Sequence, residues 1–194
     1  TIEIRHEIHA NPELSFHEFA TSRIVCRELD RIGVPYEESP CKPGIIATID
    51  SGKPGKFLML RADMDALPIA EATGLEFASV HKGVMHACGH DGHTAMLLGA
   101  AKILKEHLDE VHGRIILFFE RAEENGGGIP QMLAYMDEKG LKPDTVWGIH
   151  LYAGLESGKM GLLDGGTMAS VFGFNVTIHG KGGHGSRPDQ ANSP

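Results

Sequence analysis

Short apolar runs alternate along the chain with longer segments whose apolar residues recur at helical spacing. Each short run is bounded by Gly, Pro or polar residues, which is typical of strands. Met96, Leu97, Ala100, Ile103 and Leu104 place apolar side chains on one face of a helix. The pattern predicts strands over residues 45–49, 57–60, 114–119 and 145–151, and helices over residues 6–29, 93–107 and 129–136.

Alternation of strands and helices predicts the fold class. It is typical of an α/β domain, and we expect a largely parallel (mixed) sheet flanked by helices in three layers. The first helical segment breaks at Asn11-Pro12, where the proline suits the first turn of a new helix. Residues 63–92 form a long irregular connection, and connections of that length in a compact domain are usually functional.

The character of the sequence changes after Gly165-Gly166. A further strand is predicted over residues 171–178, and a glycine-rich loop follows at 180–185. We therefore expect a domain boundary near residue 168. Residues 1–168 form the α/β domain, and residues 169–194 form the opening piece of a smaller α+β domain.

Charge and cysteine content narrow the class of protein. The formal net charge of -8 argues against nucleic acid or an anionic membrane as a partner. No apolar run approaches the roughly 20 residues that span a bilayer, and no signal peptide opens the chain. Three cysteines are an odd number, so we expect reduced thiols and a cytoplasmic location. The first residue, Thr1, is consistent with a trimmed start.

The strongest functional signal is Cys-Gly-His-Asp-Gly-His at residues 88–93. Cys and His are the usual ligands of zinc, and carboxylates extend the choice toward manganese. An acidic cluster at 120–124 follows one predicted strand, and the isolated His150 comes at the end of another, directly after Val146–Ile149. Ligands bind open α/β sheets at the carboxyl ends of strands, so we expect these groups to meet at one edge of the sheet.

Two metal ions need a ligand that bridges them, terminal ligands and a nearby base. Cys88 or a carboxylate can bridge, while His90, His150 and one of Glu123 or Glu124 can be terminal ligands. Adjacent glutamates in extended backbone point in opposite directions. We therefore expect one of them to bind metal and the other to act as general base.

Polar residues beside these candidates have structural interpretations as well. We expect Asp91 and His93 to cap the helix that begins near His93 rather than to bind metal. The positive N-terminus of that helix would help to hold the Cys88 thiolate. Asp63 and Asp65 either satisfy backbone groups of the loop or orient a metal ligand.

Longer motifs occur in a fixed order along the chain. They are Arg5-His6-Glu7-Ile8-His9 with Pro12-Glu13-Leu14, then Arg61-Ala62-Asp63-Met64-Asp65-Ala66-Leu67-Pro68, Met85-His86-Ala87-Cys88-Gly89-His90-Asp91-Gly92-His93, Ala122-Glu123-Glu124, Gly148-Ile149-His150 and Gly180-Lys181-Gly182-Gly183-His184-Gly185. With these motifs the chain resembles the metal-dependent amidohydrolases that include hippurate hydrolase, N-acyl-amino-acid amidohydrolases and plant auxin-conjugate hydrolases. The resemblance covers essentially the whole chain.

The resemblance implies a hydrolase that cleaves the amide bond of small N-acyl amino acids or related amino-acid conjugates. It implies two divalent ions, drawn from zinc, manganese, nickel and cobalt, with Cys88, His90, Glu124 and His150 as metal ligands. The activity includes peptide bonds as a nearby variant, as in aminoacylase- and carboxypeptidase-like relatives.

Three further roles follow from the same resemblance. Glu123 is implied to be the general base that activates water. Asp63 is implied to orient a metal ligand. His184, in a lid or dimerisation domain, is implied to reach a neighbouring subunit's site and steady the oxyanion. A homodimer is one expected state of the full-length form.

The chain departs from the family pattern in two ways. Glu120 and Arg121 stand where the family usually has Gln-Pro, so these charges either pair with each other or retune the base and the substrate preference. Family members are also longer and supply a further histidine ligand after the second domain. A non-catalytic metal-binding or interaction module, or an inactive fragment of such an enzyme, is therefore the alternative.

Overall fold

The computed structural model describes residues 1–37, 41–170 and 172–192. One sheet contains five strands in the order β1-β2-β4-β3-β5. They are β1 (Tyr36–Glu37), β2 (Ile45–Asp50), β3 (Phe57–Asp63), β4 (Arg114–Glu120) and β5 (Thr145–Gly148). β3 pairs in parallel with β4 and β5, whereas β2 pairs antiparallel with β1 and β4. The sheet is therefore mixed, and the expected α/β fold is confirmed.

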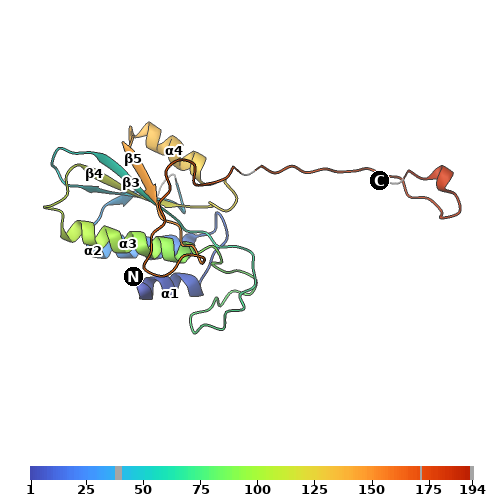
Figure 1. Ribbon diagram of the computed structural model, residues 1–194, viewed down its shortest axis with the longest axis horizontal. Coiled ribbons are helices and arrows are strands. Elements are labelled where there is room, and N and C mark those ends of the chain that lie inside the picture. The colour runs from blue at the N-terminus through green and yellow to red at the C-terminus, as the bar shows by residue number, and fades with distance from the viewer. Residues whose placement is uncertain (38–40, 171, 193–194) are drawn as a thin grey trace. The chain divides into compact units, whose positions relative to one another are not determined.

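Helices cover both faces of the sheet (Figure 1). α1 (Ile2–Ala10), α2 (Phe19–Ile32) and α3 (His90–Glu106) lie on one side, and α4 (Ile129–Glu138) lies on the other. This arrangement gives the three layers that the sequence predicts.

The central strand β4 contributes side chains to a hydrophobic core on each side of the sheet. Successive side chains of a strand point to opposite faces. Ile115 and Leu117 therefore belong to the core shared with α2 and α3, while Ile116 and Phe118 belong to the core shared with α4. All four are buried, so the apolar run predicted as a strand is explained by burial on both faces.

The second helix begins later than the sequence predicts. Pro12 does not open a helix, and α2 starts only at Phe19. The carboxylate of Glu13 accepts hydrogen bonds from the first-turn amides of Ala20 and Thr21, at 2.7 and 2.9 Å. Glu13 thus supplies from outside the helix the acceptor that its first amides need.

The third helix begins earlier than predicted, at His90 rather than near His93. Gly89 precedes it with a φ of 98°, in the left-handed region that favours glycine. The amides of Gly92 and His93 both donate to the Gly89 carbonyl, at 2.9 and 3.1 Å. His90 is therefore fixed on the first turn of a helix, and not in the loop before it.

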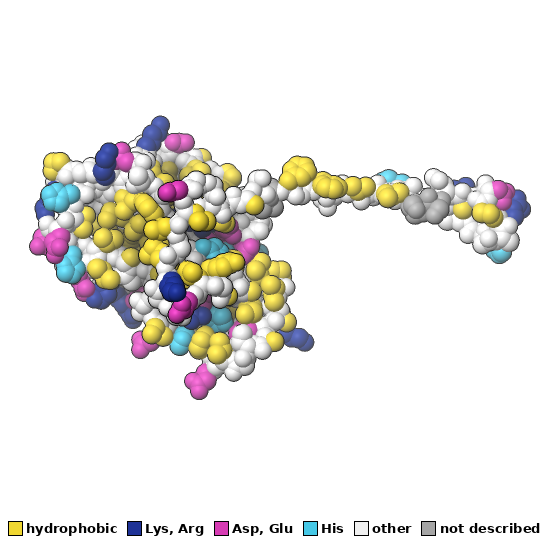
Figure 2. Space-filling model, viewed as in Figure 1, with side chains coloured by type: hydrophobic (Ala, Val, Ile, Leu, Met, Phe, Trp, Pro, Cys, Tyr) yellow, Lys and Arg dark blue, Asp and Glu magenta, His cyan; other side chains and the backbone are white. Residues whose placement is uncertain are grey.

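β5 forms an outer edge of the sheet and pairs, among the described strands, with β3. Its residues Val146 and Trp147 are exposed. Figure 2 shows hydrophobic side chains gathered on this face of the compact part of the molecule. The strand ends at Gly148, earlier than the predicted Leu151, so His150 lies in the loop after it.

The chain divides into two compact units, Thr1–Tyr152 and Ala153–Pro194. The strand predicted over residues 171–178 is wrong for 172–178, which are in no helix or strand, and residue 171 lies outside the described residues. The described part of this second unit offers them no partner strand for a ladder. The domain boundary near residue 168 stays a prediction. No helix among the described residues is long and apolar enough to cross a membrane.

Candidate metal centre

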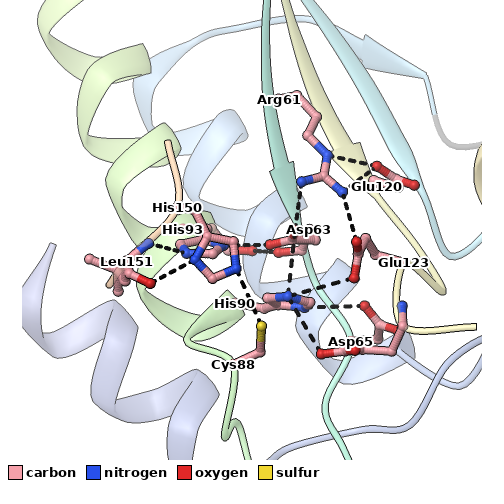
Figure 3. A network of polar contacts seen from close by, with 12 residues as sticks. Arg61, Asp63, Asp65, Cys88, His90, His93, Glu120, Glu123, His150 and Leu151 are labelled. Carbon is pink, nitrogen blue, oxygen red and sulfur yellow. Dashed lines mark hydrogen bonds and ion pairs between the residues drawn. The ribbon is translucent and has the colours of Figure 1, made fainter. Parts of the chain in front are cut away.

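His90 lies at the middle of the candidate site, where α3 begins (Figure 3). Its side chain is buried, and its Nδ1 lies 3.3 Å from Oδ1 of Asp65. A proton on Nδ1 satisfies that carboxylate and leaves Nε2 as an acceptor. Nε2 lies 3.5 Å from Asp63 Oδ2, 3.8 Å from Glu124 Oε1 and 3.9 Å from Glu123 Oε2.

His150 comes from the loop after β5 and faces the same place. Its Nδ1 lies 2.6 Å from the carbonyl oxygen of Leu151, and a carbonyl only accepts, so Nδ1 carries the proton. Nε2 is therefore the nitrogen without a proton, and it lies 3.3 Å from Sγ of Cys88. A neutral imidazole with one nitrogen held by a hydrogen bond and the other free is the form that binds metals.

Glu123 and Glu124 lie in the turn that follows β4. The expectation that extended backbone points them in opposite directions is wrong, because the chain turns at Ala122, whose φ is 52°. Both carboxylates face His90. The side chain of Glu124 is 22% exposed and that of Glu123 is 39% exposed, so Glu124 lies deeper and Glu123 is more open to solvent.

These side chains form overlapping groups of potential ligands. In the described part of the chain, three groups have ligand atoms within 4.8 Å of one another, and His90 belongs to all three. They are Cys88-His90-His150, His90-Glu123-Glu124 and Asp63-His90-His93. The structure thus brings together Cys88 before α3, His90 at the start of α3, Glu124 in the turn after β4 and His150 after β5, and this convergence is the one that the sequence predicts.

Two buried acceptors in the centre test whether a metal fits. Nε2 of His90 and Oε1 of Glu124 lie 3.8 Å apart, and neither has a hydrogen-bond partner among the described residues. Leaving such atoms unsatisfied is costly, and two acceptors cannot bond each other. A divalent cation satisfies both, and nitrogen, oxygen and sulfur donors together suit zinc and similar ions. The residues therefore fit a metal.

The surrounding charge favours a cation as well. Burial lowers the pKa of His90, but Asp65, Asp63 and Glu124 outweigh burial and raise that pKa above its usual value. Burial raises the pKa of the Cys88 thiol to about 11, and the charge of Glu124 adds to the effect. The help that the start of α3 is expected to give in holding a Cys88 thiolate stays a prediction. Carboxylates dominate the site, and positive charge is what it lacks.

Asp63 is held by two positively charged or donor groups. Arg61 Nη1 lies 2.6 Å from Oδ2, and His93 Nδ1 lies 2.6 Å from Oδ1. Burial alone would raise the pKa of Asp63, but His93, His90 and Arg61 lower it to about 2. Asp63 is thus a fixed negative charge beside His90, whereas Asp65 is the carboxylate that contacts the Nδ1 atom of His90.

Glu120 and Arg121, which depart from the family pattern, bond to other partners in the described structure. Glu120 accepts hydrogen bonds from Arg61 at 2.7 Å, and the Arg61 Nη2 atom also lies 4.0 Å from Glu123. Arg121 donates to the Lys42 carbonyl and to Gln131. Glu120 therefore pairs with Arg61, the arginine beside Glu123, while Arg121 connects the turn after β4 to the Lys42 backbone and to α4.

Asp91 and His93 do not cap α3, which has no side-chain cap hydrogen bond. Asp91 accepts from Arg5 and His9 of α1, at 3.0 and 2.9 Å. His93 connects Asp63 to the amide of Leu151, which donates to Nε2 at 2.9 Å. Sequence reasoning missed these partners because they lie between 30 and 86 residues away in the chain.

His184 lies in the second unit, where its Nδ1 atom is 2.8 Å from the Ser186 hydroxyl. Its role at an active site stays a prediction.

Comparison with known proteins identifies the family. The family described as peptidase family M20/M25/M40 matches residues 59–192, and the chain belongs to it. Thermostable carboxypeptidase 2 of Saccharolobus solfataricus is 45% identical and covers 100% of this chain. An N-acyl-L-amino acid amidohydrolase of Geobacillus stearothermophilus is 46% identical over 96% of it.

A solved structure supports the same fold. A Bacillus subtilis protein, described as a dinuclear metal-binding peptidase of the M20 family, superposes with a TM-score of 0.74 at 37% identity. The match covers 79% of this chain and 43% of the solved chain. The two curated relatives are matched over 49% and 50% of their own length, so this chain spans about half of each.

Proposed function

We propose that the protein hydrolyses the amide bond of small N-acyl amino acids or related amino-acid conjugates, with two divalent metal ions in its site. The observation that carries the proposal is the pair of buried, facing acceptors, His90 Nε2 and Glu124 Oε1, which lack partners among the described residues. In the proposal Cys88, His90, Glu124 and His150 bind the metals, which are zinc, manganese, nickel or cobalt.

Bound metal ions would polarise the scissile carbonyl and lower the pKa of water in the site. Glu123 is the proposed general base. Its carboxylate reaches the ligand cluster, 3.9 Å from His90 Nε2, yet its side chain remains 39% exposed. Glu123 would take the proton of the attacking water and later deliver it to the leaving amine, so that the carboxylate returns to its starting state.

Relatives support the substrate class. One of them is named an N-acyl-L-amino acid amidohydrolase and another a carboxypeptidase, and both cleave bonds between a carbonyl carbon and nitrogen. We propose the same reaction type here, with peptide bonds as a nearby variant. His184 is the proposed oxyanion donor in a homodimer, and we place the protein in the cytoplasm on its reduced thiols.

The test compares Glu123→Gln with Glu138→Gln, a change at an exposed residue at the end of α4. Both proteins are made from the whole open reading frame, loaded with metal and assayed on N-acyl amino acids. We expect Glu123→Gln to keep its metal content and to lose turnover by a factor of at least about 10². Unreduced turnover would remove Glu123 from the role.

Metal content separates the alternative function. Two ions per chain with hydrolysis support the enzyme. An unmodified protein that binds no ion, or binds one and hydrolyses nothing, is instead a non-catalytic binding or interaction module.

A further inference from the structure

We propose that His93 is a positioning residue for His150: it fixes the loop after β5 so that the free Nε2 of His150 faces Cys88. The inference rests on the proposed function, in which His150 binds metal. His93 itself has no free nitrogen, because its Nδ1 atom bonds to Asp63 and its Nε2 atom bonds to the Leu151 amide.

A continuous series of hydrogen bonds carries the proposal (Figure 3). Nδ1 of His93 donates to Asp63 at 2.6 Å, which makes Nε2 the acceptor, and the Leu151 amide donates to Nε2 at 2.9 Å. The carbonyl of the same Leu151 accepts from Nδ1 of His150 at 2.6 Å. One residue, Leu151, therefore transmits the position of His93 to the ring of His150.

Asp63 determines which nitrogen of His93 donates and which accepts in this series of hydrogen bonds. A carboxylate only accepts, so it selects the tautomer of His93 with the proton on Nδ1. Arg61 holds the other carboxylate oxygen at 2.6 Å and keeps Asp63 ionised and in place. His93 is 3% exposed, so water does not compete for either nitrogen. Asp63 and Arg61 thus hold the ring of His93 so that its Nε2 atom accepts the hydrogen bond from the Leu151 amide.

The loop needs such an anchor because little else holds it. His150 is exposed, and it follows β5, an edge strand whose residues are exposed along its whole length. Within the described residues, the His150 side chain makes polar contacts with Leu151 and Cys88. The ring of His93 also packs edge-on against that of His150, with centroids 4.7 Å apart.

The glycines of the 88–93 motif give the Leu151 side chain its place. A Cβ at Gly92 would meet Leu151 Cδ1 at 2.5 Å, and one at Gly89 would meet it at 3.3 Å. The side chain of Leu151 therefore packs against the backbone at Gly89 and Gly92, while its amide donates to His93. Two independent contacts define the position of the loop that carries His150.

The test compares His93→Leu, His93→Gln and, as a control, His107→Leu at the exposed end of α3. Leucine removes both hydrogen bonds, whereas the glutamine carbonyl can still accept from the Leu151 amide. Co²⁺ binding is followed by titration and by the thiolate-to-cobalt absorption that reports Cys88. We expect Co²⁺ affinity to fall about 10- to 100-fold in His93→Leu, to recover largely in His93→Gln and to stay unchanged in His107→Leu.

A second readout needs no metal. Nitrogen NMR of the metal-free protein reports which nitrogen of His150 carries the proton. We expect Nδ1–H in the unmodified protein and in His93→Gln, and a shift toward Nε2–H in His93→Leu, because a loop released from Leu151 loses the bond that selects Nδ1–H. A His93→Leu protein with an unchanged His150 tautomer overturns the inference.

The two proposals fail separately. If the unmodified protein binds no Co²⁺, the proposed function fails, while the tautomer of His150 still decides the positioning role. If His93→Leu does not fold, His93→Gln decides: unchanged tautomer and affinity support the inference, and a change in both contradicts it, because glutamine keeps the acceptor.

Discussion

The amide nitrogen of Glu124 lies 3.0 Å from Oδ2 of Asp65. This contact joins the segment after β3, which contains Asp65, to the turn after β4, which contains Glu124. The other oxygen of the same carboxylate faces His90 Nδ1 at 3.3 Å, and Ser15 donates to Oδ2 at 2.7 Å. Asp65 therefore sets the distance between the start of α3 and the turn after β4, which carry two of the proposed ligands.

Loss of Asp65 is expected to weaken metal binding. In Asp65→Ala the ring of His90 loses its acceptor and the Glu124 backbone loses its anchor, so we expect divalent-metal affinity to fall about 10- to 100-fold. Isothermal titration with Zn²⁺ measures the change. Asp137→Asn, at an exposed position in α4, is the control. Equal affinity in both variants would show that Asp65 does not orient these groups.

Gly92→Ala tests the packing of the Leu151 side chain against α3 without removing a hydrogen-bonding group. The new Cβ would meet the tip of the Leu151 side chain at 2.5 Å, and that tip can move. We expect the unfolding free energy to change by less than about 1 kcal/mol, because alanine also favours the helix, while Co²⁺ affinity falls several-fold. Gly99→Ala, also in α3, is the matched control, because the atoms nearest to its Cβ belong to the Thr1 side chain and not to Leu151. A similar Co²⁺ affinity in the two variants would refute the prediction.

Glu18 makes stability depend on pH. The side chain is fully buried and accepts from the Ala122 amide at 2.6 Å; burial raises its pKa from 4.5 to about 7. Between these values the folded protein holds a proton that the unfolded chain has released, so the unfolding free energy falls as pH rises. The fall attributable to Glu18 is of the order of 3 kcal/mol.

Urea unfolding at several values between pH 4.5 and 7.5 measures this dependence. We expect Glu18→Gln to flatten the curve in that range, because glutamine does not titrate. Glu138→Gln, exposed in α4, should leave the curve unchanged. An equally steep curve in Glu18→Gln would assign the pH dependence to other groups.

Glu13 stabilises the start of α2. Its carboxylate accepts from the amides of Ala20 and Thr21 and from the Thr21 hydroxyl. We expect Glu13→Ala to lower the unfolding free energy by about 1–2 kcal/mol, since the first amides of the helix lose their acceptors. Chemical unfolding monitored by circular dichroism gives the value. The exposed Glu76→Ala is the control, and a Glu13→Ala protein as stable as that control would contradict the assignment.

Most of the sheet follows from the sequence because its strands are apolar runs with clear ends. Residues 115–119 are buried on both faces, so their hydrophobicity alone marks a central strand. The strand over 172–178 failed for the opposite reason. Its apolar pattern has no partner strand in the described part of the second unit, and a single strand cannot satisfy its own backbone.

Residue types and the order of the motifs determined the chemistry of the candidate site. Cys88, His90, Glu124 and His150 carry the donor atoms that metals prefer, and each lies at or beside the end of a predicted strand or helix. Parallel strands bring their carboxyl ends to one edge, so the sequence was enough to place these groups together.

Only the tertiary structure decided how each group is oriented. The turn at Ala122 sends both glutamates to one side, Asp65 chooses the free nitrogen of His90, and His93 engages Leu151. These outcomes depend on hydrogen bonds between residues far apart in the chain. A sequence pattern reports the periodicity of burial, but the direction of a buried polar side chain is set by the partner that folding brings to it.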